Sequence, residues 1–326
     1  MWPYSKALES ELIDVKERHL VIAKNLSGTF ERYYQDVTSL FTVLSAELGK
    51  KEVNLEIKNL FGTYGFQAVM LVSSNTGEVK TCLFHNVKSC PTKISPDILK
   101  LALSSIIEGG TKLSSVTEDK NINSGPILLA VKQEGENFTL GYLSTSYIVK
   151  MGKKVAFGEK GHAAIVDQDG NVMAHPLDSW IKSRKNISKV SAVQKMMSGG
   201  TGVEIFYSPA LKADMIAGYT SVPNAKWGVM VPQPMAELKN KAKKIDEKAM
   251  LVMVLGLGLA LLITIPISYV LIQPLERLSR VIKSIEKGNF EINVQFNVSK
   301  FLPLEIQELK KGFMKMMDKL QENKKA

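Results

Sequence analysis

The stretch GHAAIVDQDGNVMAHP, residues 161–176, decides how most of this chain is interpreted. Apolar runs stand on both sides of an Asp-Gly pair, and this pattern predicts two strands joined by a tight turn. The stretch FQAVMLVSSNTGEVKTC, residues 66–82, has the same arrangement around Asn75-Thr76-Gly77. Two hairpins of one kind predict two related modules in tandem.

Each hairpin is followed by a predicted helix that ends at two glycines and then by further strands. The helices are expected at 95–110 and 188–197, and the strands at 127–133, 138–148, 203–208, 214–222 and 227–234. We therefore predict an α+β fold with two PAS-like antiparallel-sheet modules, at 61–150 and 151–232.

A long N-terminal helix is predicted over residues 4–48, within a stalk placed at 1–60. Apolar side chains recur along it at steps of three and four, and Gly49 is expected to end it. The stripe consists of Leu8, Leu12, Val15, Ile22, Leu26, Phe30, Tyr33, Val37, Leu40, Leu44 and Leu48. A stripe of this length predicts a dimer seam, where His19 would be a packed interface residue.

Residues 249–272, AMLVMVLGLGLALLITIPISYVLI, contain no charged residue and predict a transmembrane helix. At a helical rise of about 1.5 Å per residue the stretch reaches about 36 Å, enough to cross a bilayer core. A return helix over 233–248 leads into it from the second module. Basic residues on its two flanks nearly balance, so charge does not set the orientation.

Residues 273–326 predict two amphipathic helices joined by an extended linker over 289–303. The first helix is expected to begin at Pro274 and to end at Gly288. The apolar positions are Leu275, Leu278, Ile282 and Ile285 in the first helix, and Ile306, Leu309, Phe313, Met316 and Leu320 in the second. This heptad spacing favours a coiled-coil pair, and two helices lying on the membrane surface are the alternative.

The composition excludes some functions. Lys and Arg number 42 against 32 Asp and Glu, a net charge of +10, yet the signs are mixed and no basic block alternates with aromatic residues. No nucleic-acid partner is expected. Cys82 and Cys90 could form a local disulfide or remain two thiols, and their spacing fits no common zinc site.

No sequence pattern for catalysis is present. The chain lacks a phosphate-binding glycine loop, a nucleophile elbow and a His/Glu pair at metal spacing, so neither an enzyme nor a cofactor is predicted. Asp167, Asp169 and Gly170 resemble the start of a calcium loop, but the absence of further ligands favours a hairpin turn. His162 and His175 bracket the same hairpin and could approach each other across its strands, but two surface or core residues are expected.

The order of these elements over about residues 4–240 resembles a double Cache sensor domain, and residues 273–326 resemble a HAMP domain. Pro274 and Glu305 match HAMP marker positions, whereas Leu304 and Gln307 depart from them. The resemblance implies that residues 1–248 are extracytoplasmic (periplasmic) and that 273–326 are cytoplasmic. It also implies a further membrane helix just before Met1.

The resemblance further implies a homodimeric membrane sensor that binds a small extracytoplasmic ligand and signals through the span to the HAMP domain and a separate cytoplasmic output protein. The ligand would lie in the membrane-distal module, 61–150. Its candidate residues are Tyr64, Lys132, Tyr142, Ser144 and Ser146. Amino-acid sensors carry an Asp where Ser146 stands, so an α-amino acid ligand is not expected. A membrane-anchored adaptor or structural protein that transmits no signal is the alternative.

Overall fold

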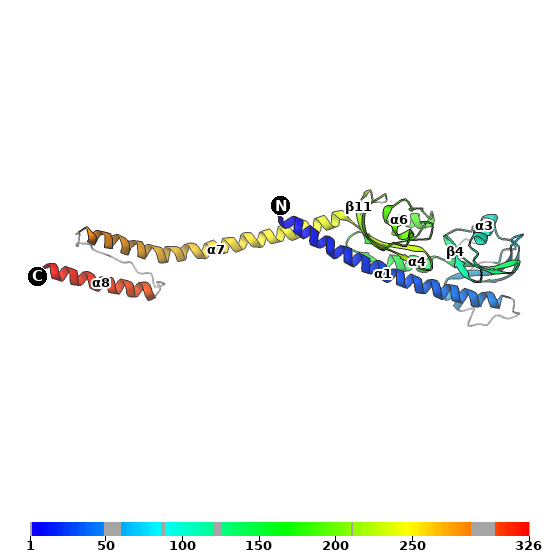
Figure 1. Ribbon diagram of the computed structural model, residues 1–326, viewed down its shortest axis with the longest axis horizontal. Coiled ribbons are helices and arrows are strands. Elements are labelled where there is room, and N and C mark those ends of the chain that lie inside the picture. The colour runs from blue at the N-terminus through cyan, green and yellow to red at the C-terminus, as the bar shows by residue number, and fades with distance from the viewer. Residues whose placement is uncertain are drawn as a thin grey trace. The chain divides into compact units, whose positions relative to one another are not determined.

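The computed structural model describes residues 2–48, 60–85, 89–119, 125–209, 211–287 and 304–325. It divides into two compact units, Met1–Lys244 and Ile245–Ala326. The first unit contains a long N-terminal helix and two five-stranded antiparallel sheets (Figure 1). The predicted α+β class is therefore confirmed.

The first sheet is built around the hairpin predicted at 66–82. Its elements are β1 (Phe66–Ser73), β2 (Val79–Phe84), α3 (Pro96–Ser104), β3 (Thr111–Leu113), β4 (Ile127–Glu134) and β5 (Asn137–Ser144). The strand order is β2-β1-β5-β4-β3. Gly77 has a φ of 72° in the hairpin turn, and Ser95 caps α3 by accepting a hydrogen bond from the Ile98 N–H at 3.4 Å.

The last predicted strand of this module, 138–148, is shorter in the structure. It ends at Ser144, and α4 (Ser146–Lys153) follows directly. The Ser146 N–H donates to Ser144 Oγ at 3.2 Å, and the Val149 N–H donates to the Thr145 carbonyl at 3.0 Å. These bonds start a helix where the apolar residues alone predicted a longer strand.

The second sheet repeats the plan. Its elements are β8 (Ala164–Val166), β9 (Val172–Ala174), α5 (Asp178–Lys182), α6 (Ser191–Met197), β10 (Gly202–Ser208), β11 (Ala213–Val222) and β12 (Trp227–Pro234). The strand order is β10-β11-β12-β8-β9. A small two-stranded ribbon, β6 (Ala156–Phe157) and β7 (Gly161–His162), precedes it. β8 and β9 confirm the predicted hairpin.

The N-terminal helix, α1 (Trp2–Glu47), covers one face of both sheets (Figure 1). Phe30, Val37 and Leu44 are fully buried there, in one apolar cluster with residues of β1, β4, β5 and β12. The predicted dimer seam is therefore wrong for this stripe, because the chain's own sheets cover it. Helices α3 and α6 pack on the opposite faces of the two sheets.

Glycines sit where α1 passes closest to the sheets. A Cβ added to Gly218 on β11 would lie 2.4 Å from the His19 carbonyl carbon and 2.5 Å from the Leu20 nitrogen. A Cβ on Gly141 of β5 would lie 2.6 Å from the Phe41 ring. His19 is fully buried at the Gly218 crossing, within its own chain rather than at the predicted dimer interface, and burial lowers its pKa to about 4.

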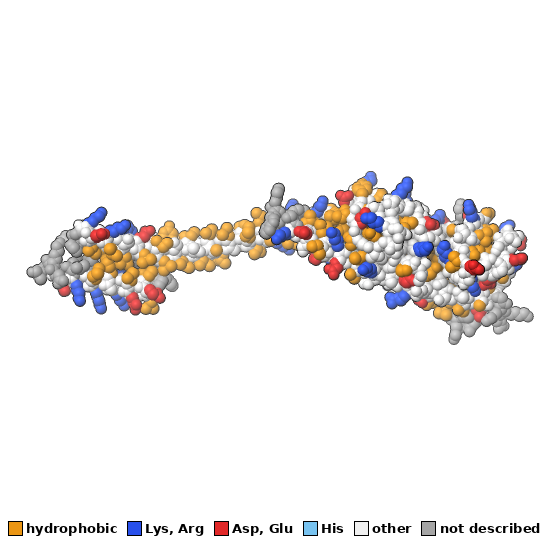
Figure 2. All heavy atoms as spheres, viewed as in Figure 1, with side chains coloured by type: hydrophobic (Ala, Val, Ile, Leu, Met, Phe, Trp, Pro, Cys, Tyr) orange, Lys and Arg blue, Asp and Glu red, His pale blue; other side chains and the backbone are white. Residues whose placement is uncertain are grey.

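The second unit contains most of α7 (Met235–Glu286) and all of α8 (Leu304–Lys325). α7 is the one described helix that is long and apolar enough to span a membrane. It includes residues 249–272, and Figure 2 shows hydrophobic side chains along the visible face of this segment. α7 is continuous past Pro274, so the prediction that a new helix begins there is wrong.

The two amphipathic helices pack together through part of their predicted stripes. The predicted Leu278 of α7 is buried against Phe313 of α8 together with Val281, which lies outside the predicted stripe, whereas the predicted Leu275 and Ile282 are exposed. The predicted helix end at Gly288 and the linker at 289–303 lie outside the described residues, as does Gly49.

We predict that Gly218→Ala destabilises the protein by about 3 kcal/mol, because the methyl group meets the backbone of α1 and cannot be accommodated by a rotamer change. Thermal unfolding of the full chain in detergent measures the effect. Gly28→Ala is the matched control, since no atom lies within 4 Å of its added Cβ and alanine favours the helix by about 1 kcal/mol. Equal melting temperatures for both variants would contradict the close crossing.

Candidate functional site

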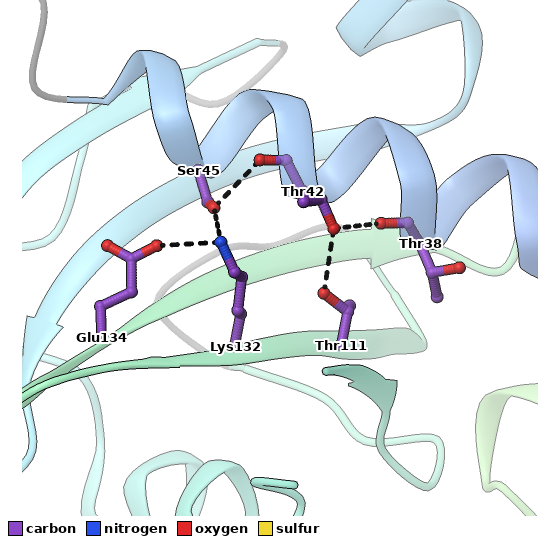
Figure 3. Close-up of polar contacts among 6 residues, drawn as sticks. All are labelled: Thr38, Thr42, Ser45, Thr111, Lys132 and Glu134. Carbon is purple, nitrogen blue, oxygen red and sulfur yellow. Dashed lines mark hydrogen bonds and ion pairs between the residues drawn. The ribbon is translucent and has the colours of Figure 1, made fainter. Parts of the chain in front are cut away.

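Lys132, one of the predicted ligand-binding residues, lies on the face of the first sheet that α1 covers (Figure 3). Its Nζ donates to Ser45 Oγ at 3.2 Å and lies 3.6 Å from Glu134 Oε1. Beside it, the hydroxyls of Thr42 and Thr111 are 3.3 Å apart. These contacts join α1 to β3 and β4, so the Lys132 ammonium is used to hold the helix on the sheet.

Tyr142 lies on the opposite face of the sheet, in the apolar cluster under α3. Its hydroxyl donates to Asp119 Oδ2 at 2.6 Å, and both side chains are buried. Burial, together with the adjacent carboxylate, raises the pKa of the Tyr142 phenol. Asp119 was missed in the sequence because it lies in a loop without periodicity, 23 positions from Tyr142.

The other three predicted residues meet at one end of the sheet. The Tyr64 carbonyl accepts a bond from the Tyr33 hydroxyl at 3.4 Å, and the Ser144 N–H donates to the Gly65 carbonyl at 2.9 Å. Ser146 opens α4 and is exposed. The structure thus brings Tyr64, Ser144 and Ser146 together, apart from both Lys132 and Tyr142.

The loop that carries Asp119 also contacts the second module. The Val116 N–H donates to Asp167 Oδ2 at 2.8 Å, and Arg184 Nη1 lies 2.7 Å from Glu118 Oε2. The Ser115 hydroxyl bonds to Asp169. One segment, 114–119, therefore joins the Tyr142 face of the first sheet to the Asp-Gly hairpin of the second.

Asp167 is the centre of this contact. Its buried carboxylate also accepts bonds from the Asp169 N–H and from the backbone and side-chain nitrogens of Asn171, each at 2.9 Å. Burial raises the pKa of Asp167, while these hydrogen bonds act in the opposite direction. The predicted hairpin turn is confirmed, and its first aspartate binds the neighbouring module.

We predict that Asp167→Ala destabilises the protein by about 3 kcal/mol, because it leaves the buried Val116 N–H and the partly buried Asp169 and Asn171 N–H groups without an acceptor. Chemical denaturation of the full chain in detergent gives the change. Asp178→Ala is the control, since this exposed carboxylate forms a surface ion pair with Lys153 and should change stability little. The prediction fails if both variants unfold at the same denaturant concentration.

A cavity of about 540 Å³ lies in the second module, where the end of α4, the β6–β7 ribbon and the segment after β9 meet. Lys153, Val155, Lys160, His162, His175 and Leu177 line it. None of the five predicted ligand-binding residues does. The two histidines therefore share a concave site and approach each other, which was the alternative to the ordinary surface or core residues that we expected.

Comparison with solved structures identifies the fold. The periplasmic sensory domain of the Campylobacter jejuni chemoreceptor Tlp1 is 13% identical, with a TM-score of 0.52 over 70% of this chain and 98% of that domain. The ligand-binding domain of the Pseudomonas aeruginosa PAO1 amino acid chemoreceptor PctB, in complex with L-Arg, is 19% identical, with a TM-score of 0.51 over 76% and 99%. No protein-family profile and no curated protein matches the chain.

Another similar structure is the extracellular domain of rpHK1S-Z16, a candidate histidine kinase. It is 12% identical, with a TM-score of 0.53 over 68% of this chain and 95% of that domain. The chain thus has the fold of extracytoplasmic sensor domains, and its described residues include one helix that is long and apolar enough to cross a membrane. At these identities the likeness concerns the fold alone.

Proposed function

We propose that this protein is a membrane-bound sensor of the double Cache type, which binds a small extracytoplasmic ligand and signals as a homodimer. The observation that carries the proposal is a fold shared with almost the whole length of solved sensor domains, joined through one helix to an apolar segment of membrane-spanning length. The described residues also hold no cluster of three or more metal-ligating side chains.

The ligand site is placed on the Tyr142 face of the first module. An apolar face with a few convergent polar groups is typical of small-molecule sites, and the Tyr142–Asp119 pair is such a polar group within the cluster under α3. A ligand that competes for this hydrogen bond would displace the loop at 114–119. The Val116 N–H of this loop donates to Asp167 of the second module, so a displacement of the loop would also act on the second module.

The second module is in turn attached to the first turn of α7. Glu237 on α7 accepts bonds from the Lys160 N–H at 2.8 Å, the Glu159 N–H at 3.2 Å and Gln233 Nε2 at 2.9 Å. Lys241 Nζ lies 2.8 Å from Glu11 on α1. A movement of the β6–β7 ribbon would therefore be applied to α7 and reach the proposed HAMP pair at 273–326.

We predict that a member of a panel of organic acids, amines and purines raises the melting temperature of the full chain in detergent, because a ligand stabilises the folded state by mass action. Tyr142→Phe removes the hydroxyl that bonds Asp119 and should weaken this effect about tenfold in ligand concentration. Tyr207→Phe is the control, since this exposed residue on β10 lies in the other module.

If no compound of the panel raises the melting temperature and a protein co-purifies with the chain, the alternative of an adaptor that transmits no signal is favoured. A shift that Tyr142→Phe leaves unchanged would retain the sensor but remove the ligand from this face. The two results separate the function from the position of its site.

We predict that residues 1–248 are extracytoplasmic and 273–326 cytoplasmic. The disulfide between Cys82 and Cys90, with Cα atoms 6.2 Å apart, supports this because disulfides persist outside the reducing cytoplasm. With the natural gene and its full upstream sequence, alkaline phosphatase fused after Ala326 should be inactive. After replacement of the native cysteines, an impermeant maleimide should label Ser179→Cys in intact spheroplasts.

A fluorescent protein fused after Ala326 is the positive control for a cytoplasmic C-terminus. An active phosphatase together with a protected thiol would reverse the topology. The sensor would then read metabolites inside the cell.

A further inference from the structure

The cavity of the second module contains a pair of histidines that no step of the proposed signalling uses. The His162 and His175 rings are 5.1 Å apart between centroids and inclined at 80°. His175 stacks on Trp180 at 4.7 Å, which fixes the plane of its ring. Both line the 540 Å³ cavity, and a second, smaller hollow adjoins it at the same two rings.

Hydrogen bonds assign the proton on each ring. His162 Nδ1 lies 2.9 Å from the Lys160 carbonyl, which can only accept, so Nδ1 carries the proton and Nε2 is an acceptor. His175 Nδ1 accepts from the Leu177 N–H at 3.0 Å, so its proton is on Nε2. Among the described residues, neither Nε2 makes a hydrogen bond with the protein. The pair therefore offers a ligand one hydrogen-bond donor, the Nε2–H of His175, and one acceptor, Nε2 of His162.

The charges around the cavity balance. Lys153 on α4 is paired with Asp178 at the start of α5, with Nζ 2.6 Å from Oδ1. The turn between β6 and β7 contributes Glu159 and Lys160, whose side chains carry opposite charges. The rest of the lining is largely apolar, and includes Val155, Ala163 and Leu177. Such a site favours an uncharged ligand over an ion.

We propose that this cavity is a second binding site, which takes a small uncharged molecule carrying an amide or lactam group. The ligand N–H donates to His162 Nε2, and its carbonyl accepts from the His175 Nε2–H. The volume suits a single ring with short substituents, since small-molecule sites usually range from about 300 to 1,000 Å³. The site is distinct from the Tyr142 face of the first module.

A carboxylate is disfavoured at the same pair. Its two oxygens only accept, so His162 would have to take up a proton to become a donor. Burial lowers the pKa of His162, and burial together with the neighbouring imidazole lowers that of His175 to about 4. The amide and acid forms of one ring compound are therefore a direct test of the assignment.

The test is titration calorimetry on the full chain in nanodiscs, with nicotinamide, benzamide and uracil as probes and nicotinate and benzoate as matched acids. At pH 7.5 we expect at least one amide or lactam to bind, and the acids to bind at least tenfold more weakly. His162→Phe keeps a ring but removes the acceptor, and should lower amide affinity about tenfold or more. His85→Phe, an exposed histidine in the first module, should leave it unchanged.

Acid pH provides an independent measurement. Amide affinity should be constant down to about pH 6.5, the usual imidazole pKa, and should fall at lower pH as protonation turns the His162 acceptor into a donor. Fluorescence of Trp180, which stacks on His175, should change when the amide binds, and Trp180→Phe identifies its signal. This readout needs no histidine variant, so it stays informative if His162→Phe misfolds.

Three results would overturn the proposal. They are the absence of binding by every amide and lactam, acids that bind as tightly as their amides at pH 7.5, and amide binding that survives His162→Phe. None of these results bears on the Tyr142 site, because all the substitutions tested lie in the second module except the His85 control.

Discussion

The packing of α1 against two sheets is the constraint on which the rest of the sensor unit depends. The apolar stripe of α1 must cover one face of each sheet, so the helix and the strands approach closely at Gly141 and Gly218. At Gly218 the α1 backbone occupies the place of a Cβ, and only glycine allows that distance. The same helix also covers the polar contacts of Lys132 with Ser45 and Glu134.

The two modules differ in chemistry although their sheets share a plan. The first carries a buried Tyr142–Asp119 pair under a short helix, and the second carries the His162–His175 cavity between the end of α4, the β6–β7 ribbon and the segment after β9. The segment at 114–119 connects them, because its Val116 N–H donates a hydrogen bond to the carboxylate of Asp167. If both proposed sites bind ligands, this buried hydrogen bond offers a physical route by which one could affect the other.

In the proposed mechanism, the signal leaves the second module through the first turn of α7. Glu237 accepts three hydrogen bonds there, two of them from the ribbon that also carries one wall of the cavity. The helix then continues without interruption through the apolar segment to Glu286. A continuous helix transmits a displacement at one end as a rigid element, which is why the continuity past Pro274 matters for the proposed signalling.

The sequence by itself determined the fold class and most of the elements, although it missed α4 and the continuity of α7 past Pro274. Strand alternation, turn glycines and the apolar segment at 249–272 are local signals, and β12 has the bounds that these signals predict. Only the tertiary structure decided which groups meet. The α1 stripe packs on its own sheets rather than on a partner, and the Tyr142 hydroxyl donates to Asp119. These contacts join residues distant in the chain, so they depend on strand order and on the α1 crossing, which no local period encodes.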